Sequence, residues 1–347
     1  MKSTEHGNGT AHDPDLLLKA ALTRRDFLTR AAVASGLALA SGGVFAALYD
    51  GSGPSALPPE KTLAGLPDFS LPEFAGPKAR VAIVRGPDRA QTLGRGLDAL
   101  GGIGRFITKG DTVLIKVNAA FASPPSLGAT SHPELVVALV AQCKQAGAGR
   151  VLITDNPIHN PESCFELAGL AEAARQSGAK ILLPTENLFA SVSLAGGRLI
   201  QNWPVLAKAF DGVNKVLAVA PIKDHHRAGA SMILKNWYGL LGGRRSVFHQ
   251  DINSIIAELS MLIRPTLCIL DGTTAMLTNG PTGGSMADLA ATNTMIVSTD
   301  PVAADAAGLS VLGRAPEEVP YLLAAQAMGA GTVNYQGLDP VLVEQGG

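Results

Sequence analysis

The sequence places its most chemically versatile side chains directly after short apolar runs, each of which has the composition of a buried β-strand. The polar residues at the ends of these five runs are Lys116 and Asn118, Asp155, Lys223 and His225, Asp271, and Asp300. In an open α/β sheet, ligands bind outside the carboxyl ends of the strands. We therefore expect these side chains to meet at one edge of a sheet, although an Asp or Asn after a strand often only caps a turn.

The carboxylates of this set are candidate ligands for a divalent metal. Carboxylate oxygens suit hard cations, and imidazole nitrogens suit transition metals. The predicted metal ligands are Asp155, Asp271, Asp300 and Asp305. The sequence does not identify the cofactor, so a divalent metal and a small anion are alternatives.

A second set of residues is suited to acid–base chemistry or to holding an anion. Lys235 and Asn236 lie in an apolar and aromatic stretch, where a lysine needs an acidic partner or an anionic ligand. A structural salt bridge is the alternative for Lys235. His132 precedes Pro133 at a predicted helix start, where an anion can bind and an imidazole can transfer protons.

From these patterns we assign candidate roles. The candidate catalytic residues are Lys116, Asn118, His132, Lys235 and Asn236; the candidate cofactor-binding residues are Lys223, His225, Gly280 and Gly283; further cations that can hold a phosphate or carboxylate are Arg227, Arg244 and Arg245. The two glycines lie in a Gly-rich loop whose backbone amides can approach a ligand.

The elements that must position these residues alternate along the chain. Strands are predicted at residues 81–84, 112–117, 151–154, 180–183, 215–220, 265–270 and 294–298, and helices at 90–100, 133–146 and 162–176. Continuous apolar strands between helices are typical of a mostly parallel sheet with helices on both faces. Residues 193–200 resemble a small β-hairpin with a Gly-Gly turn. The predicted fold class is therefore α/β.

The first fifty residues have the pattern of an export signal. Arg24 and Arg25 are followed by Phe27-Leu28 and an Ala- and Gly-rich apolar stretch that ends in a small-residue cleavage pattern at Ala46. Paired arginines in this context resemble a twin-arginine signal, which implies the twin-arginine translocase as a partner and a periplasmic location. An uncleaved segment would instead anchor the protein in the membrane. We expect a signal at 1–46, a Pro- and Gly-rich linker at 47–77 and one domain at 78–340.

Composition and cysteine usage exclude some classes of protein. The chain is 46% hydrophobic and 16% charged with a formal net charge of −1, so we expect a globular protein that does not bind nucleic acid. Cys143, Cys164 and Cys268 are too widely spaced for an iron–sulfur or zinc motif. An iron–sulfur cluster held by the chain itself is therefore not expected. In an oxidising compartment, Cys143 and Cys164 could form a disulfide.

The order of these motifs resembles the DUF362 family, a domain family of unknown function. The stretches that carry the resemblance are residues 116–118, 130–136, 147–155, 223–225, 234–239, 249, 269–272, 280–281 and 298–305. The resemblance implies one domain over about residues 78–330 and supports the site candidates, but it supplies no reaction. Many relatives carry ferredoxin modules beside this domain, and this chain departs from that pattern because its cysteines are scattered.

Three hypotheses for function follow. The first is an enzyme that uses a divalent metal or an anionic ligand at the strand ends. The second is a non-catalytic redox accessory that docks to a partner protein or borrows an iron–sulfur cluster from it. The third is a periplasmic binding or maturation factor for a small anion or a metal.

Overall fold

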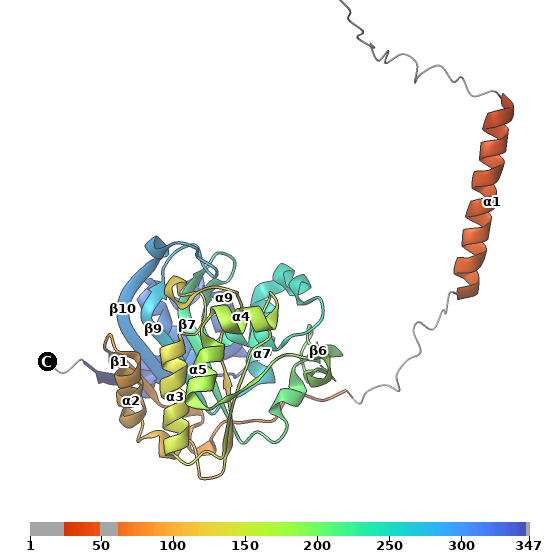
Figure 1. Cartoon of the computed structure of the whole chain (residues 1–347). Helices are drawn as coiled ribbons and strands as arrows, with labels where there is room; N and C mark the ends of the chain where they lie inside the picture. Colours follow the sequence, from red (N-terminus) through yellow and green to blue (C-terminus); the bar gives the residue numbers. More distant parts are fainter. Residues whose placement is uncertain (1–23, 49–61, 345–347) are drawn as a thin grey trace, which may run out of the picture. The chain divides into compact units, whose positions relative to one another are not determined.

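The structure, a computed structural model, describes residues 24–48 and 62–344 (Figure 1). The chain divides into two units, with the boundary between Pro59 and Glu60. The first unit contains the helix α1 (Arg24–Leu48), and the second is the folded body. Residues 1–23 of the predicted signal and 49–61 of the predicted linker lie outside the described residues.

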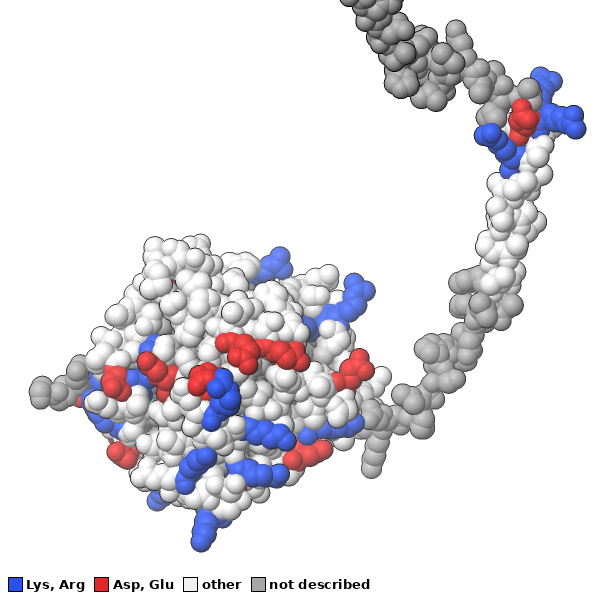
Figure 2. Space-filling model, viewed as in Figure 1, with Lys and Arg blue, Asp and Glu red and all other residues white. Residues whose placement is uncertain are grey.

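Helix α1 carries all its charged residues near its start. Arg24, Arg25, Asp26 and Arg30 lie in its first two turns, and the rest of the helix is uncharged (Figure 2). A stretch of 21 residues, Arg24–Val44, is long and apolar enough to cross a membrane, a test that a signal sequence near an N-terminus also passes. The structure thus confirms an apolar helix where the sequence predicts a signal. The export route and cleavage after Ala46 stay predictions.

The body is built on a 9-stranded sheet in the order β11-β1-β10-β9-β7-β2-β3-β4, with β8 paired to β7. The strands are β1 (Val81–Arg85), β2 (Thr112–Lys116), β3 (Arg150–Thr154), β4 (Lys180–Leu182), β7 (Lys215–His225), β8 (Gly229–Ser231), β9 (Leu267–Met276), β10 (Leu289–Ser298) and β11 (Val341–Val343). Parallel pairing joins β9, β7, β2, β3 and β4, whereas β10 runs antiparallel to both of its neighbours, β1 and β9. The sheet is therefore mostly parallel, as predicted.

Helices cover both faces of this sheet. The helices of the body are α2 (Arg89–Ala99), α3 (Pro133–Gln145), α4 (Pro161–Leu167), α5 (Leu170–Ser177), α6 (Ile233–Asn236), α7 (Ile252–Leu262), α8 (Pro301–Leu309) and α9 (Pro320–Ala327). Apolar residues of α2, α3, α4 and α5 join one core cluster, and those of α6 to α9 join another. Because the sheet lies between two apolar layers, its central strands are apolar on both faces, which is the pattern read from the sequence.

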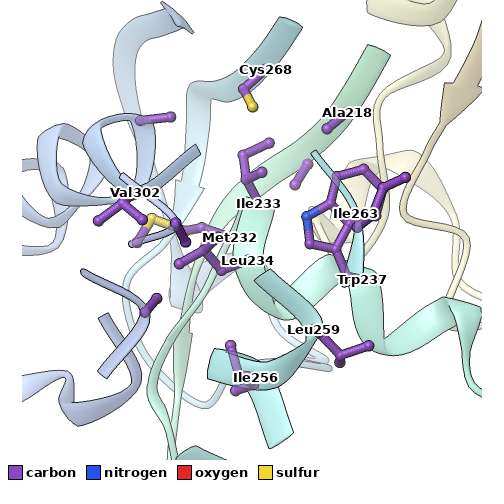
Figure 3. Packing of buried hydrophobic residues seen from close by; sticks show 14 of the residues in the cluster. Ala218, Met232, Ile233, Leu234, Trp237, Ile256, Leu259, Ile263, Cys268 and Val302 are labelled. Carbon is purple, nitrogen blue, oxygen red and sulfur yellow. The ribbon is translucent and has the colours of Figure 1, made fainter. Parts of the chain in front are cut away.

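The short helix α6 is fixed by its apolar residues. Met232, Leu234 and Trp237 lie among Ile256 and Leu259 of α7 (Figure 3), and all five are buried. A helix of this length has no stability of its own in water, so this packing holds it in place. Packing therefore fixes the backbone that carries Lys235 and Asn236.

Several predicted boundaries differ from the structure. Phe69 and Phe74, in the predicted linker, are buried, and Phe69 N–H donates to the Arg264 carbonyl at 3.0 Å, so the body begins earlier than residue 78. The predicted helix at 162–176 is divided at Gly169, which has a φ of +70°. The hairpin is formed by β5 (Ala190–Val192) and β6 (Trp203–Val205), outside the strands predicted for it.

Candidate functional site

The candidate site lies where three neighbouring parallel strands end. β3, β2 and β7 are adjacent in the sheet, and Asp155, Asn118 and Lys223 lie at or just beyond their carboxyl-terminal parts. Parallel strands bring their carboxyl ends to one edge, so these three side chains meet as predicted. All three line one cavity of about 350 Å³, which Lys235 and Asn236 of α6 also line.

A group of buried polar side chains forms one wall of this cavity and continues behind it. Lys116 Nζ is 2.7 Å from Asp155 Oδ1 and donates hydrogen bonds to the Val117 carbonyl at 2.7 Å and the Asn236 carbonyl at 3.0 Å. Asp155 Oδ2 accepts a hydrogen bond from Ala119 N–H at 2.6 Å. We call Lys116, Asp155 and Asn236 the buried polar group. Every donor of the Lys116 ammonium has an acceptor in this group or in the Val117 carbonyl, so Lys116 joins β2, β3 and α6 instead of lining the cavity.

Two further residues hold the buried polar group in place. Gly239 allows the close approach of the chain after α6, because a Cβ there would lie 2.0 Å from Asp155 Oδ1. Arg245 donates to the carbonyls of Asn156 at 2.8 Å, Leu241 at 3.2 Å and Pro157 at 2.6 Å. The guanidinium of Arg245 is thus used to fix the loop after β3, although its edge lines the cavity.

The cavity lining is strongly biased toward basic side chains. The basic and imidazole side chains that line it are Lys223, His225, His226, Arg227, Lys235, Arg245 and His249. Asp155 is the one carboxylate among the described lining residues, and Lys116 already pairs with it. Such a site has an excess of positive charge that a small anion would balance.

Lys223 is the most deeply buried of these cations. Its side chain is fully buried, and Nζ donates one hydrogen bond, to the Ala129 carbonyl at 2.5 Å. Nζ also lies 5.5 Å from the centre of the Phe121 ring. Burial, together with the nearby charge of Lys235, lowers the pKa of Lys223 to about 7.

Lys235 reaches the same cavity from α6. Its Nζ lies 5.7 Å from the centre of the Tyr238 ring, and no carboxylate among the described residues pairs with it. Burial, followed by the charge of Arg245, lowers the pKa of Lys235 to about 8. The sequence predicted an acidic partner or an anionic ligand for Lys235, and the described residues supply no such acid.

His225 is held as a neutral imidazole. Its Nδ1 accepts hydrogen bonds from Arg227 N–H at 3.2 Å and Ala228 N–H at 3.1 Å, so Nδ1 carries no proton and Nε2 does. Burial, with the nearby charge of Lys235, lowers the pKa of His225 to about 2. His225 therefore presents a donor to the cavity without adding charge.

The Gly-rich loop after β9 closes the cavity on another side. Gly280 N–H donates to Asp224 Oδ2 at 3.1 Å, and a Cβ on Gly280 would lie 1.9 Å from the Asp224 carbonyl oxygen. This approach places Pro281 and Thr282 in the lining. Neither Gly280 nor Gly283 lines the cavity, so the two predicted cofactor-binding glycines shape the loop and do not line the site.

His132 and Asp271 lie in a second cavity, of about 370 Å³. Asp271 is inside β9 and accepts a hydrogen bond from Arg89 Nε at 2.8 Å. Burial, followed by the charge of Arg89, lowers the pKa of His132. Because β9 continues past residue 270, Asp271 does not join Asp155 at one site, and that part of the prediction is wrong.

Asp300 lies at the opposite edge of the sheet and Asp305 lies within α8, and both carboxylates accept hydrogen bonds from backbone N–H groups at helix starts. Because β10 is antiparallel to its neighbours, its carboxyl end points away from the candidate site. Asp300 accepts hydrogen bonds from Val302 N–H at 2.8 Å and Ala303 N–H at 2.9 Å at the start of α8. Asp305 accepts from the N–H groups of Ile233 and Leu234 at 2.8 and 3.0 Å, which fixes the start of α6. Burial raises the pKa of Asp305 to about 7.

The predicted metal site is therefore not formed. The four aspartates lie in separate places, and the described part of the chain contains no group of three or more His, Cys, Asp or Glu side chains that could hold a metal. Cys143, Cys164 and Cys268 are all buried and free, so the alternative of a disulfide between Cys143 and Cys164 is not realised.

Sequence reasoning missed Phe121 and Tyr238, which contribute aromatic surfaces to the cavity. Phe121 belongs to no strand or helix, and only its position five residues after β2 hinted at the site. Of the further cations, Arg227 lines the cavity, whereas Arg244 does not.

Comparison with known proteins gives one family match and several distant likenesses. Residues 113–310 match the family described as "Domain of unknown function (DUF362)". The chain is 28% identical over 246 residues to the "Thylakoid-associated protein sll1697" of Synechocystis sp. (strain ATCC 27184 / PCC 6803 / Kazusa), which covers 67% of this chain and 73% of that protein.

Two solved structures are similar at low sequence identity. The lactate racemase apoprotein from Thermoanaerobacterium thermosaccharolyticum gives a TM-score of 0.38 at 13% identity, over 70% of this chain and 58% of that one. A protein from Thermotoga maritima gives a TM-score of 0.36 at 11% identity, over 70% of this chain and 60% of that one. The chain thus spans less than two thirds of either protein.

Proposed function

The chain belongs to the family of the domain of unknown function DUF362, and from this premise we propose that it binds a small organic or inorganic anion in the basic cavity at the carboxyl ends of β2, β3 and β7. The ligand class is a carboxylate or phosphate. The matched residues, 113–310, include both the buried polar group and the basic side chains of the cavity.

The observation that carries this proposal is the balance of charge in the cavity. Lys235 lines it without a carboxylate partner among the described residues, and the one carboxylate in the described lining already neutralises Lys116. Buried charges are normally paired, because desolvation of an unpaired ion costs several kcal/mol. An anion bound between Lys223, Lys235 and the Nε2–H of His225 would satisfy these groups together.

The size of the cavity suits a small ligand. Its volume of about 350 Å³ is at the lower end of the range for small-molecule sites. Phe121 and Tyr238 add apolar surface, which favours a ligand with a short carbon skeleton beside its charged group.

The alternatives receive less support from the described residues. A metal-dependent enzyme needs a convergent ligand set, and a cluster-binding redox accessory needs cysteines or a partner that supplies them. The described chain offers neither such a ligand set nor a group of cysteines. We therefore retain anion binding, which the enzyme and binding-factor hypotheses share.

Helix α1 supports a proposal about location. Its arginine-rich start and uncharged remainder have the pattern of a twin-arginine signal, so we propose that the folded body is exported through the twin-arginine translocase. The name of the Synechocystis relative describes that protein as thylakoid-associated, which fits a protein of this family at a membrane. A retained α1 would anchor the body to that membrane.

A thermal-shift experiment distinguishes the anion from the metal. The full chain is heated with phosphate, pyruvate or oxalate, and separately with magnesium or zinc chloride. We expect at least one of the three anions to raise Tm in a concentration-dependent manner, because a ligand that binds only the folded state stabilises it. Stabilisation by a divalent cation alone would contradict the proposal and favour a metal site.

A further inference from the structure

The environment of Lys223 differs from that of the other buried lysine. Lys116 pairs with Asp155 and has an acceptor for every donor, whereas Lys223 Nζ has one acceptor, the Ala129 carbonyl. Both side chains are fully buried. Lys116 is thus built into the structure as an ammonium, whereas Lys223 has one hydrogen-bond acceptor and the ring of Phe121, with no acidic partner among the described residues.

A neutral amine fits the contacts of Lys223. An ammonium has three N–H donors and no lone pair, so two of its donors would remain without an acceptor among the described residues. A neutral amine can donate one N–H to the Ala129 carbonyl and keep its lone pair available. Lys223 is among the residues that line the cavity, which places its side chain beside a bound molecule.

The surrounding charges favour the same form. The titratable and charged groups that line the cavity with Lys223 are Asp155, His225, His226, Arg227, Lys235, Tyr238, Arg245 and His249. The nearby cation Lys235 opposes a positive charge at Lys223, and this effect outweighs the attraction of Asp155, which is paired with Lys116. Burial and an adjacent cation are the two means by which proteins turn a lysine into a nucleophile.

We propose that Lys223 forms an imine with the carbonyl carbon of a small anion that carries both a carbonyl group and a carboxylate or phosphate, with Lys235 holding the charged end. The substrate class is therefore the 2-oxo acids and the phosphorylated small aldehydes and ketones. This inference rests on the proposed function, because the anion must first bind in the cavity.

The covalent step is balanced without a cofactor. The lone pair of Lys223 Nζ attacks the carbonyl carbon, the C–N bond forms, and the carbonyl oxygen takes up a proton to give a carbinolamine. The nitrogen gives up both of its protons: one balances the proton already taken up by the carbonyl oxygen, and the second converts the hydroxyl group into water, which leaves as a C=N bond replaces C=O. No electrons are gained or lost, and the only other product is water.

The two lysines have pKa values in the order that this step needs. The pKa of Lys223 is lowered to about 7 and that of Lys235 to about 8. In the interval between them, Lys223 is largely a free amine while Lys235 still carries the charge that holds the anion. Imine formation should therefore rise as pH increases through about 7 and fall as pH increases beyond about 8.

The test is reductive trapping with pyruvate as the probe. The full chain is incubated with pyruvate and sodium borohydride, which reduces an imine to a stable secondary amine, and the product is measured by intact mass and peptide mapping. We expect one reduced pyruvate per chain, located on Lys223, with a maximum between about pH 7 and 8. The same experiment is repeated with dihydroxyacetone phosphate. Adducts spread over the exposed lysines with both probes, or no adduct with either, would overturn the inference.

Variants separate this inference from the proposed function. Lys223→Arg keeps a cation but has no nucleophilic amine, so it should lose the adduct; Lys180→Met, at the exposed start of β4, should keep it. If Lys223→Arg fails to fold, peptide mapping of the natural chain still shows whether the adduct lies on Lys223. Saturable pyruvate binding without an adduct would refute the imine and leave the proposed function intact, whereas the absence of an adduct together with the absence of binding by pyruvate, oxalate and phosphate would refute both.

Discussion

At the scale of single residues, Lys116 and Lys223 show how the same side chain serves two purposes at one sheet edge. Lys116 is matched by Asp155 and by carbonyl acceptors, so its charge contributes to holding β2, β3 and α6 together. Lys223 is buried without such a partner and faces the cavity. No acidic partner among the described residues balances Lys223, so this lysine, and not Lys116, indicates a ligand site.

Replacement of Lys116 tests its structural role. Lys116→Met leaves Asp155 buried and unpaired, so we expect the free energy of unfolding to fall by about 3–5 kcal/mol. The double variant Lys116→Met/Asp155→Asn removes both charges and should recover part of this loss. Urea unfolding of the three proteins measures the effect, and a loss below about 1 kcal/mol in the single variant would show that the pair is not structural.

Replacement of Lys223 should have the opposite effect on stability. The pKa of Lys223 is about 7 in the folded protein, below that of an unfolded chain, so between about pH 7 and 10 the unfolded state binds more protons. The contribution of Lys223 to the free energy of unfolding therefore rises with pH, by at most about 1.4 kcal/mol per pH unit. We expect Lys223→Met to be more stable than the natural chain at pH 7, with the difference shrinking toward pH 10.

Urea unfolding of both proteins across this pH range checks the sign. A difference that is constant with pH would mean that Lys223 has an ordinary pKa in the folded state. A matched Lys180→Met variant, at an exposed position, should follow the natural chain at every pH.

The positions of several site residues could be predicted from the sequence. Asn118, Asp155 and Lys223 follow or end parallel strands, and the rule for the carboxyl ends of such strands placed them together. Their partners could not be predicted, because whether a lysine is paired depends on contacts between distant segments. The sequence could not show that Asp155 pairs with Lys116 and leaves Lys223 without an acid.

At the scale of elements, strand direction decided which predictions failed. Asp300 follows an apolar run as Asp155 does, but β10 is antiparallel and carries Asp300 to the other edge of the sheet. Parallel and antiparallel strands of this sheet have similar apolar runs in the sequence, since both kinds are buried on both faces. Asp271 failed for a second reason, because β9 continues for several residues beyond the predicted end.

Helix α6 depends on Asp305 although Asp305 lies outside the site. Its carboxylate accepts two backbone N–H groups at the start of α6, and Asp305→Ala would leave both donors buried and unpaired. We expect the free energy of unfolding to fall by about 2–5 kcal/mol, and binding of the anion to weaken because Lys235 is carried by α6. Denaturation and calorimetry with pyruvate measure the two effects.

Asp98→Ala is a suitable control for this prediction, because Asp98 is an exposed residue of α2. It should change the free energy of unfolding by less than about 0.5 kcal/mol. If Asp305→Ala behaved like this control, the start of α6 would not depend on the carboxylate.

At the scale of the whole molecule, the chain combines a body with a closed apolar core on each face of its sheet and a separate apolar helix. A compact body with its own apolar core is compatible with the proposed route, which exports folded proteins. The lysines and histidines of the cavity would then be assembled, and able to hold a ligand, before the protein reaches its final compartment.

The export proposal predicts a specific dependence on the paired arginines. Arg24→Lys/Arg25→Lys keeps the charge of α1 but removes the arginine pair, and we expect the full chain to stay in the cytoplasm. Cell fractionation of an expressing bacterium measures this. Arg30→Lys, in the same helix, should still be exported, and export of the double variant would refute the twin-arginine route.

Isothermal calorimetry on the full chain with pyruvate, oxalate and phosphate at pH 7.5 tests most directly whether the basic cavity binds an anion. The account predicts saturable one-to-one binding of at least one of these anions, a loss of at least about tenfold in affinity for Lys235→Met, and unchanged affinity for Lys180→Met. The absence of binding by all three anions, or equal affinity in Lys235→Met, would contradict the assignment of this cavity as an anion site.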